Sequence, residues 1–570
     1  MATHPHAGAR SRTLLPDLWV VLLSVLLLGP VLSPGFVLTY DMVWVPDLAL
    51  TRDALGVGSA LPRAVPSDAV VAVLDEVVPG ALLQKVVLLG CLLGAGTGVA
   101  RLARPSVVVR LVTASVYLWN PFVVERLTMG HWPVLVGYAV APWVVLALRS
   151  WRRDGRLPLR LLWLLPLGSL SASTGVVLAV LAVVLALVLR VRRAAYVVVV
   201  VVLANAPWLA SGLLHVGVAT SDAGGAAQFA LHDEGAVPGP LAALTLGGIW
   251  NAEVVPDART GALGWLALVV LVGLAALGVA GLRRHLGGRA AAGLAACAVL
   301  GWAVAVLSWA APGAVGWLAA TVPGGGLVRD TTRLLALTAP VLALLVGEGA
   351  GRLVQVLPRP ARPGAGVVVA LLPIALLPGV AWGAGGRLVP TDYPPDHAVA
   401  REAVRDAVAS RQDGDAVLLP FSSYRQPAWN GDRKVLDPTG RYLGIDVVAD
   451  DALSVDGVEL PGEDPRAARV GRALEEADPR GRAIALREEG VGLVVVERGA
   501  GAAPVVTGRV VHHGPELQVL ALGPVTPAPP PRGWWAVMAV AWAAYVVVGL
   551  GGAVAGLVQT WRRRRARVDA

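Results

Sequence analysis

The feature that most constrains the fold is a series of long apolar stretches that recurs along the chain. Many of them approach or exceed the roughly 18 residues that a helix needs to cross a hydrocarbon layer. Only 15% of the 570 residues are charged and 56% are hydrophobic, whereas a soluble protein of this size carries far more charge. The pattern predicts a polytopic α-helical membrane protein with about ten full spans and one fold-back helical pair.

The basic residues lie in short clusters between the apolar stretches, and they account for the net charge of +9. Such clusters mark the cytoplasmic ends of membrane helices, so they indicate orientation in a membrane and not nucleic-acid binding. The pattern places the protein in the cytoplasmic (inner) membrane with both ends inside. Residues 1–13 form the cytoplasmic N-terminus, residues 14–383 the membrane domain, and residues 559–570 a basic cytoplasmic tail.

Residues 161–189 do not read as a single span, because basic clusters flank them on both sides. Arg160 precedes the stretch, Arg190 follows it, and serines and a glycine interrupt its middle. A single crossing would place one cluster outside, so we predict two short helices that fold back and return to the same side. Broken helices are tolerated at this depth where they pack within protein or line a cavity.

Three outer loops are predicted, at residues 39–80, 215–260 and 311–330. The first contains apolar residues at helical spacing between positions 70 and 78, with acidic residues on the opposite face. This stretch is too short to span and has two distinct faces, so it is expected to be a helix that lies on the outer membrane surface.

The composition changes at residue 384, after which the chain is polar and charged up to residue 531. This part is predicted to be a small extracytoplasmic α/β domain. Its expected strands are residues 414–420 and 492–497, its expected helices are 398–410 and 466–476, and a hairpin is expected at 509–522. A last transmembrane helix is predicted at residues 532–558.

No motif of a soluble enzyme is present, and no nucleotide-binding domain is recognisable, which argues against an ATP-driven pump. The two cysteines, Cys91 and Cys297, lie in apolar segments and offer neither a disulfide framework nor a cysteine metal site. Candidate chemistry is therefore confined to polar residues at the outer edge of the predicted spans. These are Asp41, Glu125, Arg126, His131, Asn251, Arg329, Asp330 and Arg333.

Each candidate has a functional and a structural interpretation. Arg329 and Arg333 flank Asp330 just inside the outer boundary, where basic residues are unusual, and two guanidinium groups can hold a phosphate. The alternative is an internal Arg–Asp pair that satisfies a buried loop. Glu125 and Arg126 are equally consistent with a local ion pair, and His131 with an interfacial histidine. Asp41 is either a catalytic base or an ordinary polar residue at a membrane edge.

The chain resembles the GT-C superfamily of membrane glycosyltransferases, and within it the bacterial arabinofuranosyltransferase type and its uncharacterised relatives. The resemblance rests on an acidic residue and a surface helix in the first outer loop, many spans and an outer soluble domain. The matching stretches are residues 35–46, 119–127, 137–143, 328–333, 419–421, 429–430 and 436–438. The first loop carries Asp41 alone, where several members have an adjacent acidic pair.

This resemblance implies transfer of a sugar from a polyprenyl-phosphate donor to a cell-envelope glycan or glycolipid at the outer face. It makes Asp41 the general base, and Arg329 and Arg333 the charges that stabilise the leaving phosphate, with Arg126 a further candidate. It assigns no particular cofactor and leaves a divalent metal open.

Two other functions remain open on the sequence. One is a transporter or flippase of a lipid-linked intermediate, although the charged residues within predicted spans lie toward the span ends and no internal repeat is evident. The other is a catalytically inactive GT-C-like scaffold. An enzyme requires Asp41 and the arginines of residues 329–333 to converge within about 10–15 Å on one outer cavity, whereas a scaffold does not.

Overall fold

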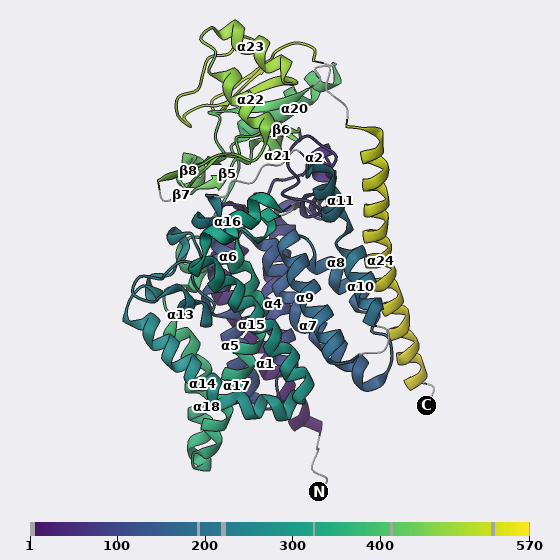
Figure 1. The fold of residues 1–570 in the computed structure, drawn as a ribbon, viewed down its shortest axis with the longest axis vertical. Coiled ribbons are helices and arrows are strands. Elements are labelled where there is room, and N and C mark those ends of the chain that lie inside the picture. Colours follow the sequence, from purple (N-terminus) through teal and green to yellow (C-terminus); the bar gives the residue numbers. More distant parts are fainter. Residues whose placement is uncertain are drawn as a thin grey trace.

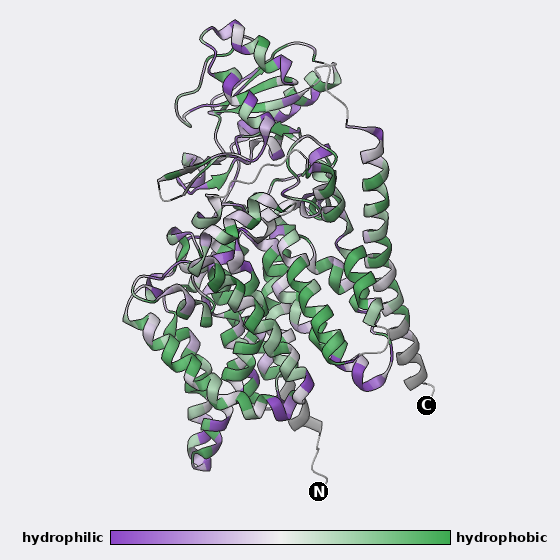
Figure 2. Ribbon diagram, viewed as in Figure 1, coloured by the Kyte–Doolittle hydropathy of each residue, from purple (hydrophilic) through white to green (hydrophobic). Residues whose placement is uncertain are grey.

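The computed structural model describes residues 6–190, 194–217, 224–322, 325–410, 414–455, 457–525 and 530–568. A tall bundle of helices carries a smaller α/β domain at one pole, and the first helix begins and the last helix ends at the opposite pole (Figure 1). Hydrophobic residues dominate the bundle, while polar residues gather in the small domain and at the far ends of the helices (Figure 2). This division matches the change of composition at residue 384.

Among the described residues, nine helical segments are long and apolar enough to cross a membrane, or ten if one bent pair is counted as a span. The prediction of a polytopic helical membrane protein with about ten spans is therefore confirmed. The spanning segments are α1 (His6–Leu28), α4 (Gly80–Leu102), α5 with α6 (Val107–Leu118 and Pro121–Thr128), α7 (Trp132–Asp154), α14 (Ala262–Leu286), α15 (Gly288–Ala310), α17 (Ala339–Val356), α18 with α19 (Arg362–Leu376 and Ala381–Gly386) and α24 (Arg532–Val568).

The bent pair is α10 (Ala194–Ala204) with α11 (Ala206–His215), which meet at an angle of 59°. The sequence predicts one span at residues 194–214. The bend falls at Asn205, two residues before Pro207, whose ring cannot continue the preceding helix. The Asn205 side chain then donates to the Val201 carbonyl at 2.7 Å and accepts from the Trp208 indole at 2.7 Å, so it stabilises the break.

Helices α8 (Leu161–Gly168) and α9 (Ala172–Val188) form the predicted fold-back pair. The start of α8 is fixed near the end of α7, because Arg160 donates to the Leu146 carbonyl at 2.9 Å. The turn between the two helices lies near the beginning of α7, where Gly137 packs against Thr174 and the Gly168 carbonyl. The chain therefore runs along α7 away from the small domain and returns beside it along α8.

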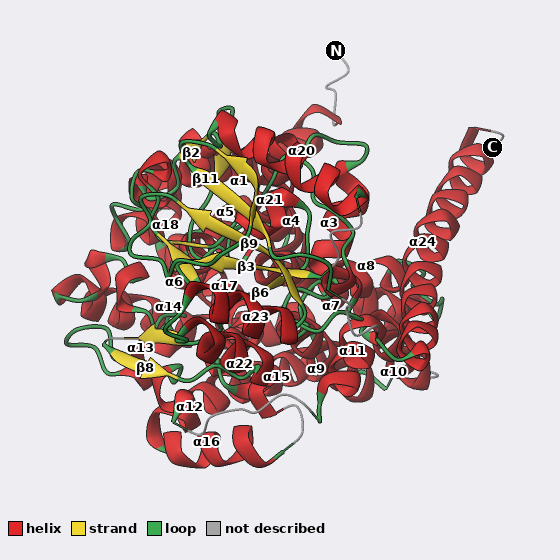
Figure 3. Cartoon of the chain, turned by 90° about the horizontal axis from the view of Figure 1, so that it is seen from above, coloured by secondary structure: helices red, strands yellow, loops and turns green. Residues whose placement is uncertain are grey.

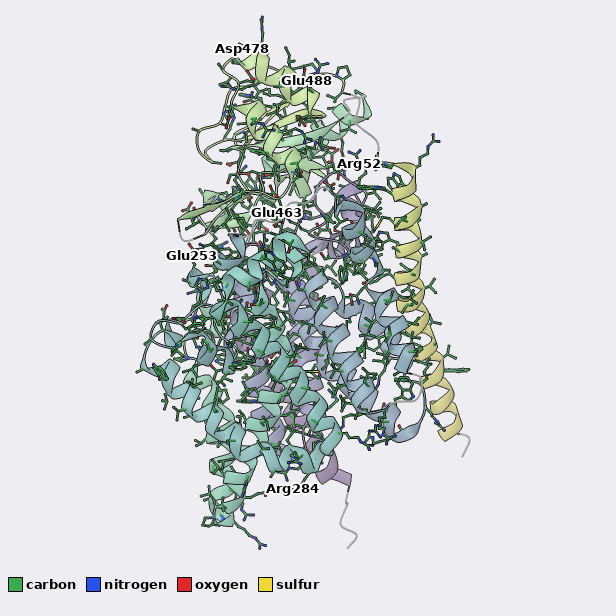
Figure 4. The ribbon with its side chains drawn as sticks, viewed as in Figure 1. Arg52, Glu253, Arg284, Glu463, Asp478 and Glu488 are labelled. Atoms are coloured by element: carbon green, nitrogen blue, oxygen red, sulfur yellow. The ribbon has the colours of Figure 1, made fainter. Side chains whose placement is uncertain are left out.

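The basic ends of several spans meet at the pole opposite the small domain. Arg104, after α4, pairs with Glu348 of α17 at 3.2 Å. His285, at the end of α14, is bonded to the Leu102 carbonyl at 3.0 Å, and the labelled Arg284 lies at the same pole (Figure 4). These basic segments thus share one side of the bundle, as the sequence predicts.

The small domain is built on a five-stranded sheet with the order β10–β11–β9–β3–β6. β3 pairs in parallel with β9 and β6, and β11 pairs antiparallel with β9 and β10. Helices lie against this sheet (Figure 3). The strands are β3 (Asp415–Leu419), β6 (Val447–Val448), β9 (Val491–Glu497), β10 (Arg509–His513) and β11 (Leu517–Ala521).

Side chains alternate between the two faces of β3, as the period of a strand requires. Val417 and Leu419 pack with α22 (Pro465–Leu474) and α23 (Pro479–Glu488), whereas Ala416 and Leu418 pack with α20 (Pro395–Ala409). The strand is buried on both faces, which explains why its sequence is a continuous apolar run.

The outer loops contain short helices, and the small domain also carries two small hairpins, β4 with β5 and β7 with β8. In the first loop, α3 (Ser67–Asp75) overlaps the stretch where a surface helix is predicted, and it leaves Val73 and Leu74 exposed. The sequence treats residues 311–330 as a plain loop, but the structure places an apolar helix there, α16 (Pro312–Thr321). The remaining elements are η1 (Gly29–Leu32), α2 (Arg52–Leu55), α12 (Gly225–Gln228), α13 (Gly239–Leu244), η2 (Ala252–Val254), η3 (Asp257–Arg259), η4 (Gly325–Val328), η5 (Thr331–Leu337), η6 (Arg359–Ala361), η7 (Ala428–Asn430), α21 (Thr439–Leu443), β1 (Phe36–Val37), β2 (Pro390–Thr391), β4 (Tyr424–Arg425), β5 (Val435–Leu436), β7 (Leu453–Val455) and β8 (Val458–Leu460).

Candidate active site

The segment that carries Asp41 is fixed between the bundle and the small domain. On the bundle side, the Asp41 amide donates to the Met129 carbonyl at 3.0 Å. On the domain side, the Tyr40 amide donates to the Lys434 carbonyl and the Tyr40 carbonyl accepts from the Leu436 amide, both at 2.7 Å. These bonds hold Tyr40 at a left-handed φ of 43°, which a non-glycine residue rarely adopts. Asp41 is therefore placed by contacts from both parts of the molecule.

A hydrogen-bonded relay joins Asp41 to a buried arginine. Asp41 Oδ2 lies 3.0 Å from His131 Nε2, and His131 Nδ1 lies 3.0 Å from Arg126 Nη1. A guanidinium group has donors and no acceptor, so Nδ1 must accept the bond from Arg126. His131 is then a neutral imidazole with its proton on Nε2, which it donates to Asp41. The relay fixes both the tautomer of His131 and the ionised state of Asp41.

Arg126 leads in turn to a second carboxylate and a second arginine. Its side chain is 1% exposed and pairs with Asp330 at 3.0 Å, and it also donates to Thr332 Oγ1 at 2.5 Å. Arg333 pairs with the same Asp330 oxygen at 2.8 Å and remains 31% exposed. The fold-back pair reaches this point too, because Ser173 accepts a 2.8 Å bond from Arg333.

Electrostatics keep the two carboxylates ionised. Burial acts to raise the pKa of Asp41, but the hydrogen bonds from His131 and Tyr424 and the charge of Arg333 hold it below the usual range. Burial also acts on Asp330, and there Arg126 and Arg333 lower its pKa far more strongly. The pKa of His131 is lowered, mainly by burial and against the influence of Asp41, in agreement with a neutral ring.

Asp41 is the most exposed carboxylate of this network, with 39% of its side chain accessible, compared with 8% for Asp330. Its second oxygen, Oδ1, accepts a 2.6 Å bond from the Tyr424 hydroxyl of the small domain. An ionised and accessible carboxylate beside a partly exposed guanidinium group can accept a proton from a hydroxyl, while the guanidinium stabilises an anion.

Arg329 lies apart from the relay. It pairs with Glu463 of the small domain at 2.9 Å and stacks over Phe229 at 4.4 Å from the ring centroid. It lines a small pocket of about 10 Å³ between the outer loops and the domain, together with Arg63 and Asp451. The structure therefore does not join Arg329 and Arg333 in one fork, since Arg329 pairs with Glu463 and Arg333 pairs with Asp330.

Glu125 and Asn251 also lie outside the relay. Glu125 is buried close to Glu234, which forms a 2.6 Å ion pair with Arg259. It is thus directed away from the site. Asn251 is buried, lies 3.2 Å from the Met129 sulfur and accepts from the Glu253 amide at 3.0 Å, so it supports the turn behind Asp41.

Sequence reasoning missed Tyr424, Ser173 and Thr332. Thr332 stands next to the Asp330–Arg333 group, and its proximity in sequence is a usable signal. Tyr424 lies 383 residues from Asp41, and no local pattern connects the two. As to a metal site, no group of three or more His, Cys, Asp or Glu side chains suited to an ion occurs within the described ranges.

The fold of the chain is shared with glycosyltransferases of known structure. One solved structure that matches is the arabinofuranosyltransferase AftD from mycobacteria, with a TM-score of 0.55 and 17% identity. The match covers 90% of this chain and 40% of that one. A mutant of the same enzyme matches with a TM-score of 0.53, 17% identity and coverage of 90% and 42%.

The likeness is one of fold, because the identity is low, and it confirms the predicted resemblance at that level. The chain spans about two fifths of the length of the solved structures that it matches. No protein-family profile matches the sequence, and no curated protein matches it.

Proposed function

We propose that the protein is an inverting membrane glycosyltransferase that moves a sugar from a polyprenyl-phosphate donor to a cell-envelope glycan or glycolipid. The reaction takes place on the outer face of the cytoplasmic membrane. The small domain lies outside, and both ends of the chain lie inside. The gathering of basic residues at the pole opposite the small domain supports this orientation, and the AftD-like fold supports the class of reaction.

The observation that carries the proposal is the relay from Arg126 through His131 to an ionised, accessible Asp41. Asp41 takes the proton of an acceptor hydroxyl as the hydroxyl oxygen attacks the anomeric carbon of the donor sugar. The bond from that carbon to the phosphate oxygen breaks, and polyprenyl phosphate leaves with the electron pair. The exposed face of Arg333 stabilises the phosphate, and Arg329 serves the next position outward.

The geometry favours an enzyme over a scaffold. A scaffold has no need for an exposed carboxylate whose partner histidine is held in one tautomer, yet three chain segments converge to produce that arrangement. A transporter or flippase is the remaining alternative, and transfer of label distinguishes it from an enzyme.

The test uses the purified full-length protein in nanodiscs with radiolabelled polyprenyl-phosphate sugars and a panel of glycan acceptors. We expect Asp41→Asn to lose about 10²- to 10⁴-fold in transfer, the range typical of a lost general base, while donor binding remains. His397→Gln is the matched control, because His397 is a buried residue of the small domain that makes no contact with the relay.

Transfer by Asp41→Asn at the wild-type rate would refute the role of the base. Donor binding without transfer in either protein, together with movement of labelled lipid across a vesicle membrane, would establish the transporter instead.

A further inference from the structure

Each oxygen of Asp41 already accepts one hydrogen bond from a side chain. His131 holds Oδ2 from the buried side, and the Tyr424 hydroxyl donates to Oδ1 at 2.6 Å from the side of the small domain. A base must accept a hydrogen bond from the hydroxyl that it deprotonates. In the observed state, the Tyr424 hydroxyl donates a hydrogen bond to Oδ1 where the acceptor hydroxyl would donate one.

The Tyr424 backbone is fixed, so its side chain is the part that can leave. Tyr424 lies in β4, which pairs with β5 through Leu436, and β5 is bridged to Tyr40 through Val435. The ring contacts Tyr40 edge-on at 6.5 Å between centroids, and it is only half-buried. Rotation of one side chain would therefore free Oδ1 without any movement of the domain.

The Tyr424 phenol and a sugar hydroxyl are the same kind of hydrogen-bond donor. Burial and the negative charge of Asp41 raise the pKa of Tyr424 well above its ordinary value, so the hydroxyl stays protonated and acts as a donor. An alcohol of a sugar offers the same single O–H donor to the same oxygen.

We infer that the acceptor sugar binds on the side of the small domain and presents its hydroxyl to Asp41 Oδ1 in the position that the Tyr424 phenol occupies. Tyr424 is then the residue that governs acceptor entry, and the small domain forms part of the acceptor site. This inference rests on the proposed function.

The side chains around the small pocket on that side have a chemistry suited to an uncharged glycan. Arg63 lines the pocket, and its charge also acts on Tyr424. Within the pocket, Arg63 pairs with Asp451 at 2.9 Å and Arg329 pairs with Glu463 at 2.9 Å. Two cations are thus balanced by two carboxylates, and Phe229 adds an aromatic surface. Such a lining offers hydrogen bonds to sugar hydroxyls without a net charge, whereas Arg333, on the relay, is left for the phosphate.

Glu463 and Glu253 mark this region in the side-chain view, since both lie where the small domain meets the helical bundle (Figure 4). Tyr40 donates to Glu253 on the same side of the site. The neighbouring tyrosine therefore provides a comparison, because its hydroxyl bonds to Glu253 and makes no bond to Asp41.

The first experiment measures steady-state transfer by Tyr424→Phe, which keeps the ring and removes the hydroxyl. We expect the acceptor KM to fall about tenfold, the effect of losing one competing hydrogen bond to a charged group, with the donor KM unchanged. Tyr40→Phe is the matched control and should leave the acceptor KM unchanged. A higher acceptor KM in Tyr424→Phe would overturn the inference, because the phenol would then help to bind the acceptor.

The second experiment does not depend on turnover. Asp41 is labelled with a water-soluble carbodiimide and an amine at pH 5, and the modified peptide is quantified by mass spectrometry. We expect faster labelling in Tyr424→Phe than in the wild type, and protection by octyl glycosides at lower concentrations in the variant. Equal labelling and equal protection in both proteins would overturn the inference. If octyl glycosides protect Asp41 from labelling but the protein transfers no sugar, the inferred acceptor site stands and the proposed reaction is refuted.

Discussion

His131 determines the state of Asp41, because it receives a hydrogen bond from Arg126 on one nitrogen and donates one from the other. A histidine beside a carboxylate usually suggests a group that titrates near neutral pH. Here the neighbouring guanidinium occupies Nδ1 as a donor, so protonation of that nitrogen would break the relay. His131 is a positioning residue and not the base itself.

The pH dependence of transfer follows from these shifts. The pKa of Asp41 is lowered, so the carboxylate stays ionised as the pH falls to the acidic side of an ordinary aspartate. The pKa of His131 is lowered as well, so the histidine stays neutral above that range. We therefore expect kcat/KM to stay level from about pH 5.5 to 8, with no step near the ordinary histidine pKa of about 6.5. A pH–rate profile with single-turnover controls measures this.

His131→Leu removes the donor to Asp41 while burial continues to act, so the pKa of Asp41 should rise and the acid limb should move toward neutral pH. The rate at pH 5 is expected to fall about tenfold or more, as one hydrogen bond to a charged group is lost. His131→Gln retains an N–H donor and should restore much of the wild-type profile. A wild-type profile with a step near pH 6.5 would contradict the assigned tautomer.

The candidate residues could be found from the sequence only in part. Asp41, Arg126, His131, Asp330 and Arg333 were selected because polar residues at the edge of an apolar span are uncommon, and the structure brings these five together. The same criterion also selected Glu125 and Asn251, which belong to neighbouring buried networks. A polar residue at the edge of a span can be recognised from the sequence. The direction in which its side chain points depends on tertiary packing, which the local sequence does not reveal.

The fold-back pair α8/α9 contributes to the site through its turn, and glycines allow the close packing of that turn against α7. A Cβ atom at Gly137 would lie 2.5 Å from the Thr174 Cβ, a distance that forces a shift. Gly137→Ala should destabilise the protein by about 1–3 kcal/mol, the usual cost of overpacking. Because Ser173 bonds to Arg333, transfer should fall as well.

Gly94→Ala on α4 is the matched substitution, since a Cβ there would meet Ala139 at an ordinary 3.5 Å. The melting temperature in detergent, followed by tryptophan fluorescence, compares the two variants. Equal melting temperatures for Gly137→Ala and the wild type would show that the turn adjusts without cost.

The elements themselves followed largely from sequence patterns. Basic clusters at both ends of residues 161–189 were sufficient to predict the fold-back, because charge fixes which side a helix end occupies. The bend at Asn205 was missed although Pro207 stands beside it. The hairpin of β4 and β5 was missed because each strand has only two residues, too few for a period to be visible. The position of this hairpin is set by the bridge between Val435 of β5 and Tyr40 in the first outer loop.

At the scale of the whole molecule, ion pairs join the first outer loop to the small domain. They occur along the loop and not at one point. They are Arg401 with Asp47 at 2.5 Å, Arg52 with Asp415 at 2.7 Å and with Asp446 at 3.0 Å, Arg63 with Asp451 at 2.9 Å, and Arg441 with Asp68 at 2.9 Å. The strand β1 adds a backbone pairing with β2. The domain and the loop therefore form a continuous structure that surrounds Asp41.

Replacing residues 390–523 by a flexible linker should abolish transfer even though the membrane helices stay intact. The Tyr40 amide would lose its acceptor, the Lys434 carbonyl, and should exchange with solvent as an unprotected amide. Hydrogen exchange measured by mass spectrometry follows residues 36–42, with α4 as the internal reference. Replacing only residues 453–460 by a short turn is the control, because this hairpin makes no contact with Asp41. In that variant, residues 36–42 should stay protected from exchange. Unchanged protection of residues 36–42 in the deletion would refute the dependence on the domain.

The long pairing between Asp41 and Tyr424, 383 residues apart, also has a consequence for biogenesis. A ribosome produces the first outer loop early, and the residues that fix it emerge only after most membrane helices have been made. The loop must therefore wait in an unfinished conformation, and a truncated translation product would have spans but no ordered base. An ordered Asp41 therefore requires synthesis to proceed at least as far as the hairpin of β4 and β5.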